Sequence, residues 1–406
     1  MISSIKNKQK VELLAPAGNL EKLKIAYLYG ADAVYVGGKK FSLRARASNL
    51  SYDEIKEAAL FANKLNKKLY ITMNIVPHGS DFDELVSYLQ FLESVNVTGI
   101  IVSSLYIADV CKKYAPKLEL HLSTQASVSN HLAIKQYADF GFKRVVFARE
   151  LDKTEIANII KRINVEAEVF IHGGMCVSYS GRCMLSNYMT NRDANRGGCA
   201  HSCRWNYDLE DLNNQKINNK YFNMGAKDLN AFRDIFDLID CGVSSLKIEG
   251  RMKSLFYIAC IVRTYRRLID DYYKYNGDIS KVDFKYYENE ILKAENRLTS
   301  VGFLRGKVTK KEQLYNVRSE NPTKDFLGIV LDYDEDKNIV TLEQRNYFKV
   351  GDVVEFIGPN LDNYSFVIEK MTDEEGLELT IARHPLQIIK MNVPIKLEKN
   401  DMMRKK

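Results

Sequence analysis

The feature that most constrains the fold is a regular alternation of short β-rich runs with amphipathic helical runs. The runs typical of strands are residues 11–15, 33–37, 68–74, 99–103, 118–123, 144–149 and 167–173. The helix-like runs between them are residues 19–30, 53–66, 81–96, 105–115, 130–141 and 152–163. Several of these helices begin at a capping side chain, such as Asn19, Ser51 or Asp152. Strands regularly followed by helices pair in parallel, so the sequence predicts a series of βαβ units.

The alternation stops after residue 173 and resumes with a helix near 228–240, a strand at 244–250 and a long helix at 253–273. Seven strands, one long insertion and an eighth strand are the count of a closed barrel. We therefore expect an α/β fold, a (β/α)8 TIM-like barrel with a cysteine-rich insertion after strand 7. An open doubly wound sheet is the alternative, because the number of strands does not by itself prove closure.

The C-terminal part of the chain has a different pattern. Residues 285–299 are helix-like, and after residue 320 the chain becomes β-rich with no long helix. The strand-like runs there are residues 327–334, 338–345, 351–358, 365–371, 377–382 and 393–399. Turn residues separate these short runs, as is typical of a small antiparallel β-barrel. We therefore predict a barrel domain at 1–320 and a small β-barrel C-terminal domain at 321–406.

Four of the seven cysteines, Cys176, Cys183, Cys199 and Cys203, lie in one stretch with the spacing C-x6-C-x15-C-x3-C. This insertion, about residues 174–207, has no periodic apolar face by which to bury itself, so a metal centre bound by thiolates is the simplest way to hold it. Structural zinc sites favour two close cysteine pairs, whereas only Cys199 and Cys203 are close here. Looser spacing in a glycine-rich loop favours an iron–sulfur cluster, with zinc or unligated thiols as alternatives.

Polar residues at the carboxyl ends of the predicted strands face the active site of a barrel of this kind. Arginine and lysine converging with amides and histidine suit a small anionic ligand that carries carboxylates. Each residue alone could equally serve as a cap or an ion-pair partner, and the set is more persuasive than its members. The candidate catalytic residues are Arg44, Arg46, Asn74, Gln125, His172, Lys247, Glu249 and Arg251.

The second half of the cysteine-rich insertion interleaves Arg192, Arg196 and Arg204 with aromatic residues that include Tyr188 and Trp205. Arginines beside stackable rings suit unpaired nucleotides, although the same rings could pack the insertion against the barrel. The net charge of +7 is compatible with a polyanionic partner.

The sequence shows no secretory signal and no apolar run long enough for a bilayer, so we expect a cytoplasmic protein with reduced thiols and no membrane association. It contains neither H-E-x-x-H nor G-x-S-x-G, and four clustered cysteines do not resemble the single activated thiolate of a cysteine protease. A peptidase interpretation therefore lacks a recognisable mechanism in the residues themselves.

Several motifs nevertheless resemble those of the collagenase-like peptidase family U32. They are LLAPAGNLEKLKIAYLYGADAVYVGG (13–38), FSLRARASN (41–49), STQASVSN (123–130), EVFIHGGMC (168–176), SGRC (180–183) and SLKIEGRMKS (245–254). Together they cover most of residues 11–273, and the β-rich tail is similar to the C-terminal domain of the same family.

Characterised bacterial members of the family look like RNA or ubiquinone hydroxylation proteins. The length of this chain, its ANRGGCAHSCRWNY stretch and its C-terminal domain resemble the branch that modifies tRNA, so the resemblance implies a function in RNA modification. It implies hydroxylation of wobble uridine, in the anticodon loop of tRNA, to 5-hydroxyuridine, with prephenate as the source of the hydroxyl group. It also implies a 4Fe–4S cluster on Cys176, Cys183, Cys199 and Cys203. The alternatives are a collagenase-like peptidase and a non-catalytic iron–sulfur RNA-binding subunit that needs a paralogous U32 partner.

Overall fold

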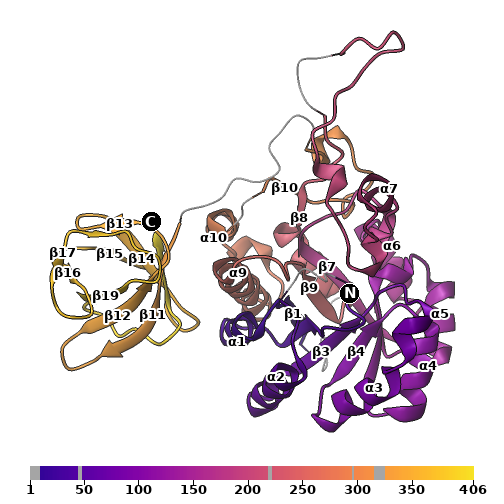
Figure 1. The fold of residues 1–406 in the computed structure, drawn as a ribbon, viewed down its shortest axis with the longest axis horizontal. Coiled ribbons are helices and arrows are strands. Elements are labelled where there is room, and N and C mark those ends of the chain that lie inside the picture. Colours follow the sequence, from indigo (N-terminus) through magenta and orange to yellow (C-terminus); the bar gives the residue numbers. More distant parts are fainter. Residues whose placement is uncertain (1–9, 44–47, 218–221, 295–296, 315–324) are drawn as a thin grey trace.

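The computed structural model describes residues 10–43, 48–217, 222–294, 297–314 and 325–406 (Figure 1). Eight parallel strands form the barrel, and all eight were expected from the sequence. Their bounds are β1 Glu12–Pro16, β2 Ala33–Gly37, β3 Lys68–Met73, β4 Gly99–Val102, β5 Glu119–Leu122, β6 Arg144–Val146, β7 Glu166–Gly173 and β9 Ser245–Ile248.

The sheet closes on itself through β9. This strand pairs in parallel with β1, where Glu12 lies opposite Ser245, and also with β7, where Glu168 lies opposite the same serine. The predicted TIM-like barrel is therefore confirmed, and the open doubly wound alternative is wrong.

Two short strands, β8 (Asp228–Asn230) and β10 (Thr299–Ser300), extend the sheet beside β7. The helix predicted from residue 228 begins later, because residues 228–230 form β8 and Leu229 and Asn230 pair with the end of β7. Similarly, the helix predicted to run to residue 299 ends at Ala294, and Thr299 pairs with Asp228.

Helices surround the barrel, as Figure 1 shows. Asn19, Ser51 and Asp152 each accept a hydrogen bond from a backbone N–H of the first turn, so the predicted caps are confirmed. The helices are α1 Leu20–Leu28, α2 Tyr52–Lys64, α3 Leu85–Ser94, α4 Leu105–Tyr114, α5 His131–Phe140, α6 Lys153–Ile160, α7 Leu185–Thr190, α8 Ile235–Asp240, α9 Leu255–Lys274 and α10 Phe284–Ala294. No helix of the described segments is long and apolar enough to cross a membrane.

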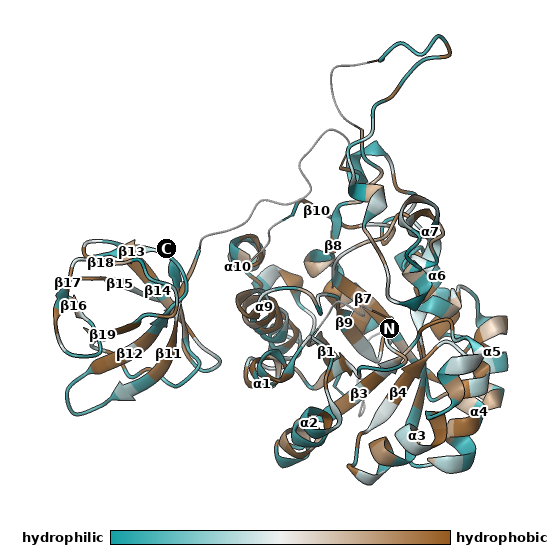
Figure 2. Ribbon diagram, viewed as in Figure 1, coloured by the Kyte–Doolittle hydropathy of each residue, from teal (hydrophilic) through white to brown (hydrophobic). Residues whose placement is uncertain are grey.

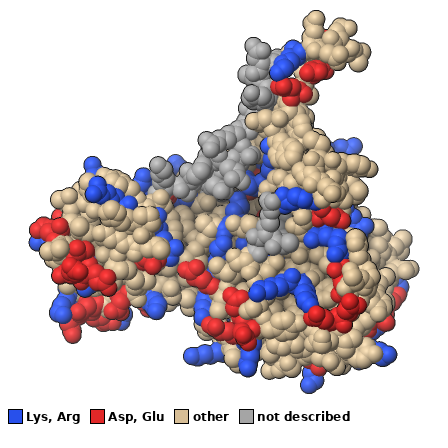
Figure 3. All heavy atoms as spheres, viewed as in Figure 1, with Lys and Arg blue, Asp and Glu red and all other residues tan. Residues whose placement is uncertain are grey.

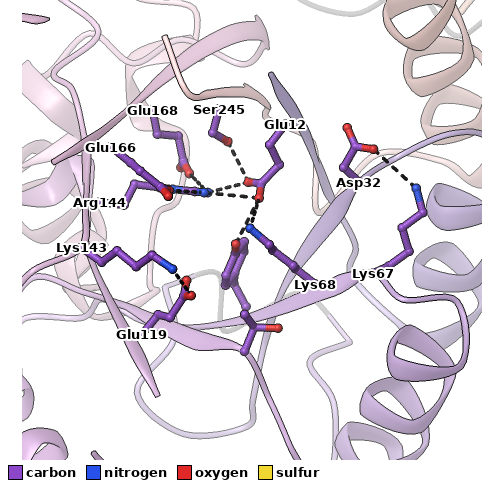
Figure 4. Close-up of polar contacts among 12 residues, drawn as sticks. Glu12, Asp32, Lys67, Lys68, Glu119, Lys143, Arg144, Glu166, Glu168 and Ser245 are labelled. Carbon is purple, nitrogen blue, oxygen red and sulfur yellow. Dashed lines mark hydrogen bonds and ion pairs between the residues drawn. The ribbon is translucent and has the colours of Figure 1, made fainter. Parts of the chain in front are cut away.

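The amino-terminal end of the barrel interior is filled with charged side chains (Figure 4). The buried Arg144 guanidinium on β6 lies 2.5 Å from Glu12 on β1, and 2.6 and 3.1 Å from Glu166 and Glu168 on β7. Ser245 on β9 also donates to Glu12 over 3.0 Å. Burial alone would raise the pKa of Glu12, but Arg144 and the other nearby cations hold that pKa below its usual value. The network therefore joins the strands at which the sheet closes.

The C-terminal domain is a curled antiparallel sheet with strands in the order β15-β14-β20-β11-β12-β19-β16-β17, beside the pair β13-β18. The bounds are β11 Phe326–Asp334, β12 Ile339–Gln344, β13 Phe348–Lys349, β14 Val353–Ile357, β15 Tyr364–Val367, β16 Met371–Thr372, β17 Glu378–Leu379, β18 Ile381–Ala382, β19 Ile388–Asn392 and β20 Met402–Lys405. The apolar residues gather inside this sheet and between the barrel strands and the helices that surround them (Figure 2).

The strand predicted at residues 393–399 is not formed. The chain pairs just before it, in β19, and just after it, in β20. Pro394 has no backbone N–H to donate to a neighbouring strand, which accounts for the interruption. The boundary predicted near residue 320 lies outside the described residues.

Buried ion pairs attach the C-terminal domain to α9 and α10. Arg404 of β20 is fully buried and donates to Glu290 of α10 over 2.6 Å and to Glu355 of β14 over 2.7 Å. Arg263 of α9 donates to the backbone carbonyls of Gly358 and Leu361. Because Arg404 and Glu290 are buried and pair across the boundary, the contact is a fixed part of the fold.

We predict that Arg144→Met lowers the free energy of unfolding by about 3–5 kcal/mol, because the substitution leaves buried carboxylates without their cation. Urea unfolding followed by circular dichroism measures the change. Lys135→Met is the control, since Lys135 is an exposed lysine of α5 paired only with Asp139, and it should cost less than about 1 kcal/mol. Equal stability of the two variants would show that the network contributes nothing.

Candidate functional site at the barrel mouth

The cysteine-rich insertion, here called the cysteine loop (residues 174–207), leaves the barrel at the end of β7. Gly173 has a φ of +106°, and a Cβ there would lie 2.2 Å from the backbone oxygen of Glu249. Only glycine fits such a close approach in the left-handed region. Gly174 N then donates to the Glu249 carboxylate over 3.0 Å, so the loop starts directly against the end of β9.

Segments that follow three other strands hold the cysteine loop over the mouth. After β3, the backbone N–H of Val76 donates to Asn195 O over 3.0 Å, and Asp81 accepts two hydrogen bonds from Arg196. Arg182 donates to the backbone oxygen of Gln125, which follows β5, over 2.6 Å. Glu150, after β6, similarly accepts a hydrogen bond from the N–H of Ser180 over 2.7 Å. Arg196, expected among the RNA contacts, is therefore engaged in holding the loop.

All four cysteines of the loop line one cavity of about 260 Å³, here called the mouth cavity. None is in a disulfide. Burial first, and then the thiol of Cys176, raise the pKa of Cys203 to about 11, with smaller contributions from Cys199 and Cys183. The four thiols are thus close enough to influence one another. In the described part of the chain, no group of three histidine, cysteine or carboxylate side chains is arranged to hold a single metal ion.

Four of the predicted site residues line the mouth cavity with the cysteines: Asn74, Gln125, Glu249 and Arg251. Asn74 donates to Ser123 Oγ over 3.3 Å and accepts from Leu43 N over 3.3 Å. Thr72 and Thr124 complete a wall rich in hydroxyl and amide groups. Such groups can read a polar, uncharged ligand by hydrogen bonding.

Arg251, predicted to bind an anion, is buried and holds a neighbouring loop. Its guanidinium donates to Ser42 Oγ over 2.9 Å and to Leu43 O over 2.8 Å, and it also bonds Asn49. These residues follow β2 and flank Arg44 and Arg46. The two predicted arginines themselves lie outside the described residues.

Lys247 lies below the cavity, inside the barrel. Its ammonium group donates to Glu168 over 2.6 Å and lies 4.5 Å from the ring centroid of Tyr35. Burial lowers the pKa of Lys247, although Glu168 opposes that shift. The lysine is therefore neutralised by a barrel carboxylate and is not among the residues that line the mouth.

His172 faces the outside of the barrel. The pairing of β7 with β9 shifts register between Phe170 and His172, which interrupts the alternation of side chains along the strand. The His172 ring lies 3.1 Å from the Tyr265 hydroxyl of α9, and burial, followed by the charge of Lys253, lowers the pKa of His172 to about 3. The structure does not bring this residue to the mouth.

A second cavity of about 470 Å³, here called the side cavity, lies between the cysteine loop, the start of α9 and the end of α10. It shares Cys176, Cys199 and Cys203 with the mouth cavity. Its remaining lining includes residues outside the predicted catalytic set, namely Arg149, Arg204, Lys253, Tyr257 and Arg297. Arg149 lies at the end of a predicted strand, so the rule that such residues face the active site could have identified it. No local sequence signal marks Arg297, because this residue reaches the cavity through the pairing of β10 with β8.

Aromatic and apolar side chains are exposed on the cysteine loop. Tyr188 is 83% exposed, and Trp205 is 40% exposed. The other exposed members are Val177, Tyr179, Met184 and Met189. On the face shown in Figure 3, lysine and arginine side chains are interspersed around the centre of the barrel part and along its boundary with the C-terminal domain.

We predict that Asp81→Asn loosens the cysteine loop, because the substitution removes the charge that pairs with Arg196 but keeps a side chain able to accept from His78 N. Loss of a partly buried ion pair corresponds to about 1 kcal/mol, so hydrogen exchange at the Val76 amide should accelerate roughly 5- to 10-fold. Mass spectrometry measures the exchange, with Asp139→Asn on α5 as the control. Unchanged exchange at Val76 would contradict the role given to this pair.

Comparison with known proteins covers both parts of the chain. The family model described as Peptidase family U32 matches residues 18–314, and the model described as Peptidase family U32 C-terminal domain matches residues 322–404. The chain is 47% identical over 415 residues to tRNA hydroxylation protein P1 of Bacillus subtilis (strain 168), covering 100% of this chain and 98% of the relative.

Two further relatives carry different names. The 23S rRNA 5-hydroxycytidine C2501 synthase of Escherichia coli (strain K12) is 36% identical over 272 residues, which are 67% of this chain and 41% of the relative. A protein named Collagenase from Porphyromonas gingivalis (strain ATCC BAA-308 / W83) is 29% identical over 408 residues, covering 96% of each chain. With its two parts matched by the two models of one family, the chain belongs to peptidase family U32.

Proposed function

We propose that this protein hydroxylates tRNA, converting wobble uridine in the anticodon loop to 5-hydroxyuridine. The observation that carries the proposal is the mouth cavity, in which four thiols share one wall with Asn74 and Gln125. A relative of nearly equal length is named as a tRNA hydroxylation protein, and a second is named as an rRNA 5-hydroxycytidine synthase. These names support RNA hydroxylation as the reaction class. A tRNA substrate further favours a cytoplasmic protein.

The mouth suits a pyrimidine base in size and chemistry. Uracil is uncharged and presents carbonyl oxygens and an N–H, which the amides of Asn74 and Gln125 and the hydroxyls of Thr72 and Thr124 can satisfy. A base in an anticodon loop has to leave its stack to enter such a cavity. The exposed ring of Tyr188 gives the neighbouring bases a surface on which to stack.

We further propose that Cys176, Cys183, Cys199 and Cys203 hold a 4Fe–4S cluster. The donor set fits, since such a cluster takes one thiolate at each of four separate irons and does not require the thiols to converge on one ion. If bound, the cluster would be held by these four thiolates and would supply one-electron transfer. The chain itself supplies the thiolates and the Gly173–Gly174 turn that sets the loop beside Glu249.

Prephenate is the proposed source of the hydroxyl group. Incubating the anaerobically purified protein with tRNA and prephenate that carries heavy oxygen in its hydroxyl group tests this assignment. Heavy oxygen in the resulting 5-hydroxyuridine supports it, whereas label that appears only with heavy water or heavy dioxygen sinks it.

A peptidase is the second candidate function, favoured by the relative named Collagenase. A cysteine nucleophile needs a lowered thiol pKa, whereas burial and the neighbouring thiols raise the pKa of Cys203. Gelatin cleavage that persists after the iron is removed would favour this candidate over tRNA hydroxylation.

We predict that Cys183→Ser abolishes 5-hydroxyuridine formation and Cys241→Ser does not, because Cys241 lies at the end of α8 and bonds only Leu238 O with its thiol. Nucleoside mass spectrometry of tRNA from a gene-deletion strain carrying either variant measures the product. Unchanged 5-hydroxyuridine in the deletion strain itself would refute tRNA hydroxylation. Binding of tRNA by the isolated chain without turnover would instead favour a subunit that needs a paralogous partner.

We also predict about four irons per chain after anaerobic purification, as a four-cysteine cubane requires. Cys199→Ser should lower that content and the visible absorption, whereas Cys241→Ser should retain both. Metal analysis with absorption spectroscopy provides the readout. Zinc in place of iron would overturn the cluster assignment without bearing on the tRNA substrate.

A further inference from the structure

The side cavity and the mouth cavity adjoin at the same thiols. Cys176, Cys199 and Cys203 line both, as do Arg149 and Glu249. A ligand in the side cavity would therefore lie against the cysteines without occupying the space that faces Asn74 and Gln125. Each cavity also has lining of its own, Asn74 and Gln125 in the mouth cavity and Lys253 and Arg297 in the side cavity, so each can hold a different molecule next to the thiols.

The side cavity is positively charged. Four cations line it: Arg149, Arg204, Lys253 and Arg297. Glu249 also lines it, and its carboxylate accepts the Gly174 N–H. Asp228 lies 3.2 Å from Lys253 and 3.5 Å from Arg297. Among the described residues that line the cavity, these four are cations and Glu249 is a carboxylate, a composition that favours an anionic ligand.

Arg204 gives an independent indication of a ligand. Its Nη1 atom is buried without a hydrogen-bond partner in the described residues, although the side chain lines the side cavity. A buried guanidinium N–H without an acceptor is costly, and arginine has five such donors in a planar fork. A carboxylate accepts two of them side by side.

The remaining lining is apolar and aromatic. Met175, Met252 and Tyr257 contribute to the wall, and the Lys253 ammonium lies 4.9 Å from the Tyr257 ring centroid. The volume of about 470 Å³ lies within the range of small-molecule sites. This wall suits an organic anion with an unsaturated or ring-shaped body better than an inorganic ion.

The mouth cavity offers an anion much less. Of its two arginines, Arg149 is shared with the side cavity and donates to Gly174 O over 2.5 Å. Arg251 is held by Ser42, Leu43 and Asn49. Lys247, which was also predicted to bind the anion, is paired with Glu168 below the cavity. The position expected from the sequence for the anionic ligand therefore has to be revised.

We propose that the side cavity is the binding site for a small organic dianion carrying two carboxylates, next to the thiols that also line the mouth cavity. The identity of the co-substrate rests on the proposed function, but binding itself requires neither RNA nor turnover. Arg204 and Arg297 are the carboxylate ligands, with Lys253 as a third cation.

The test is calorimetric titration of prephenate into the anaerobically purified full-length protein without RNA. Arg297→Gln and Lys253→Gln should each weaken binding about tenfold or more, as expected when one charge-assisted hydrogen bond is lost. Lys253→Arg should retain most of the affinity. Arg233→Gln, which removes an exposed arginine paired with Glu288, should leave it unchanged. Unaltered iron content and near-ultraviolet circular dichroism show that each variant is folded.

The outcomes separate this inference from the proposed function. Wild-type affinity in both Arg297→Gln and Lys253→Gln overturns the site even if tRNA is hydroxylated. Weakened binding in both supports the site even if no hydroxylation is found. Competition experiments identify the anion. If inorganic phosphate or an anticodon stem–loop displaces prephenate at matched concentration, the cavity binds phosphate groups. That result would overturn the assignment of a dicarboxylate.

Discussion

The contact between Arg144 and the carboxylates of Glu12, Glu166 and Glu168 underlies the rest of the structure. It joins β1 to β6 and β7, which lie far from β1 in the chain, at the place where the sheet closes through β9. Once β7 and β9 are aligned, Gly173 and Glu249 meet at the other end of the barrel. The cysteine loop starts from that meeting point, so the position of the thiols depends on how the barrel closes.

The architecture could be predicted because it follows from local sequence patterns. Short β-rich runs alternating with helical runs predicted the eight barrel strands, and Asn19, Ser51 and Asp152 marked helix starts that the structure confirms. The convergence of four cysteines on one cavity was also foreseeable, since the loop after a barrel strand opens over the mouth.

The roles of individual polar residues could not be predicted in the same way. Lys247 has its partner, Glu168, on another strand, and the two meet only when the sheet closes. His172 lies two residues after Phe170, so alternation along the strand predicts that both side chains point to the same face of the sheet. A shift in register between them instead turns the His172 ring toward α9. Arg297 lines the side cavity because a short strand after α10 returns to β8. Each case depends on a pairing between distant segments, which periodicity does not encode.

The attachment of the C-terminal domain has a consequence for how this family can diversify. Arg404 neutralises Glu290 in the middle of α10, and the last residue of that helix, Ala294, lines the side cavity. The tail is therefore not an independent module that recombination could exchange without effect. A foreign tail lacking a cation at this position would leave the buried Glu290 carboxylate, on the helix that borders the cavity, with the longer 3.4 Å contact to Arg263. The tail and the side cavity are therefore expected to be inherited together, although the tail reaches the cavity through α10.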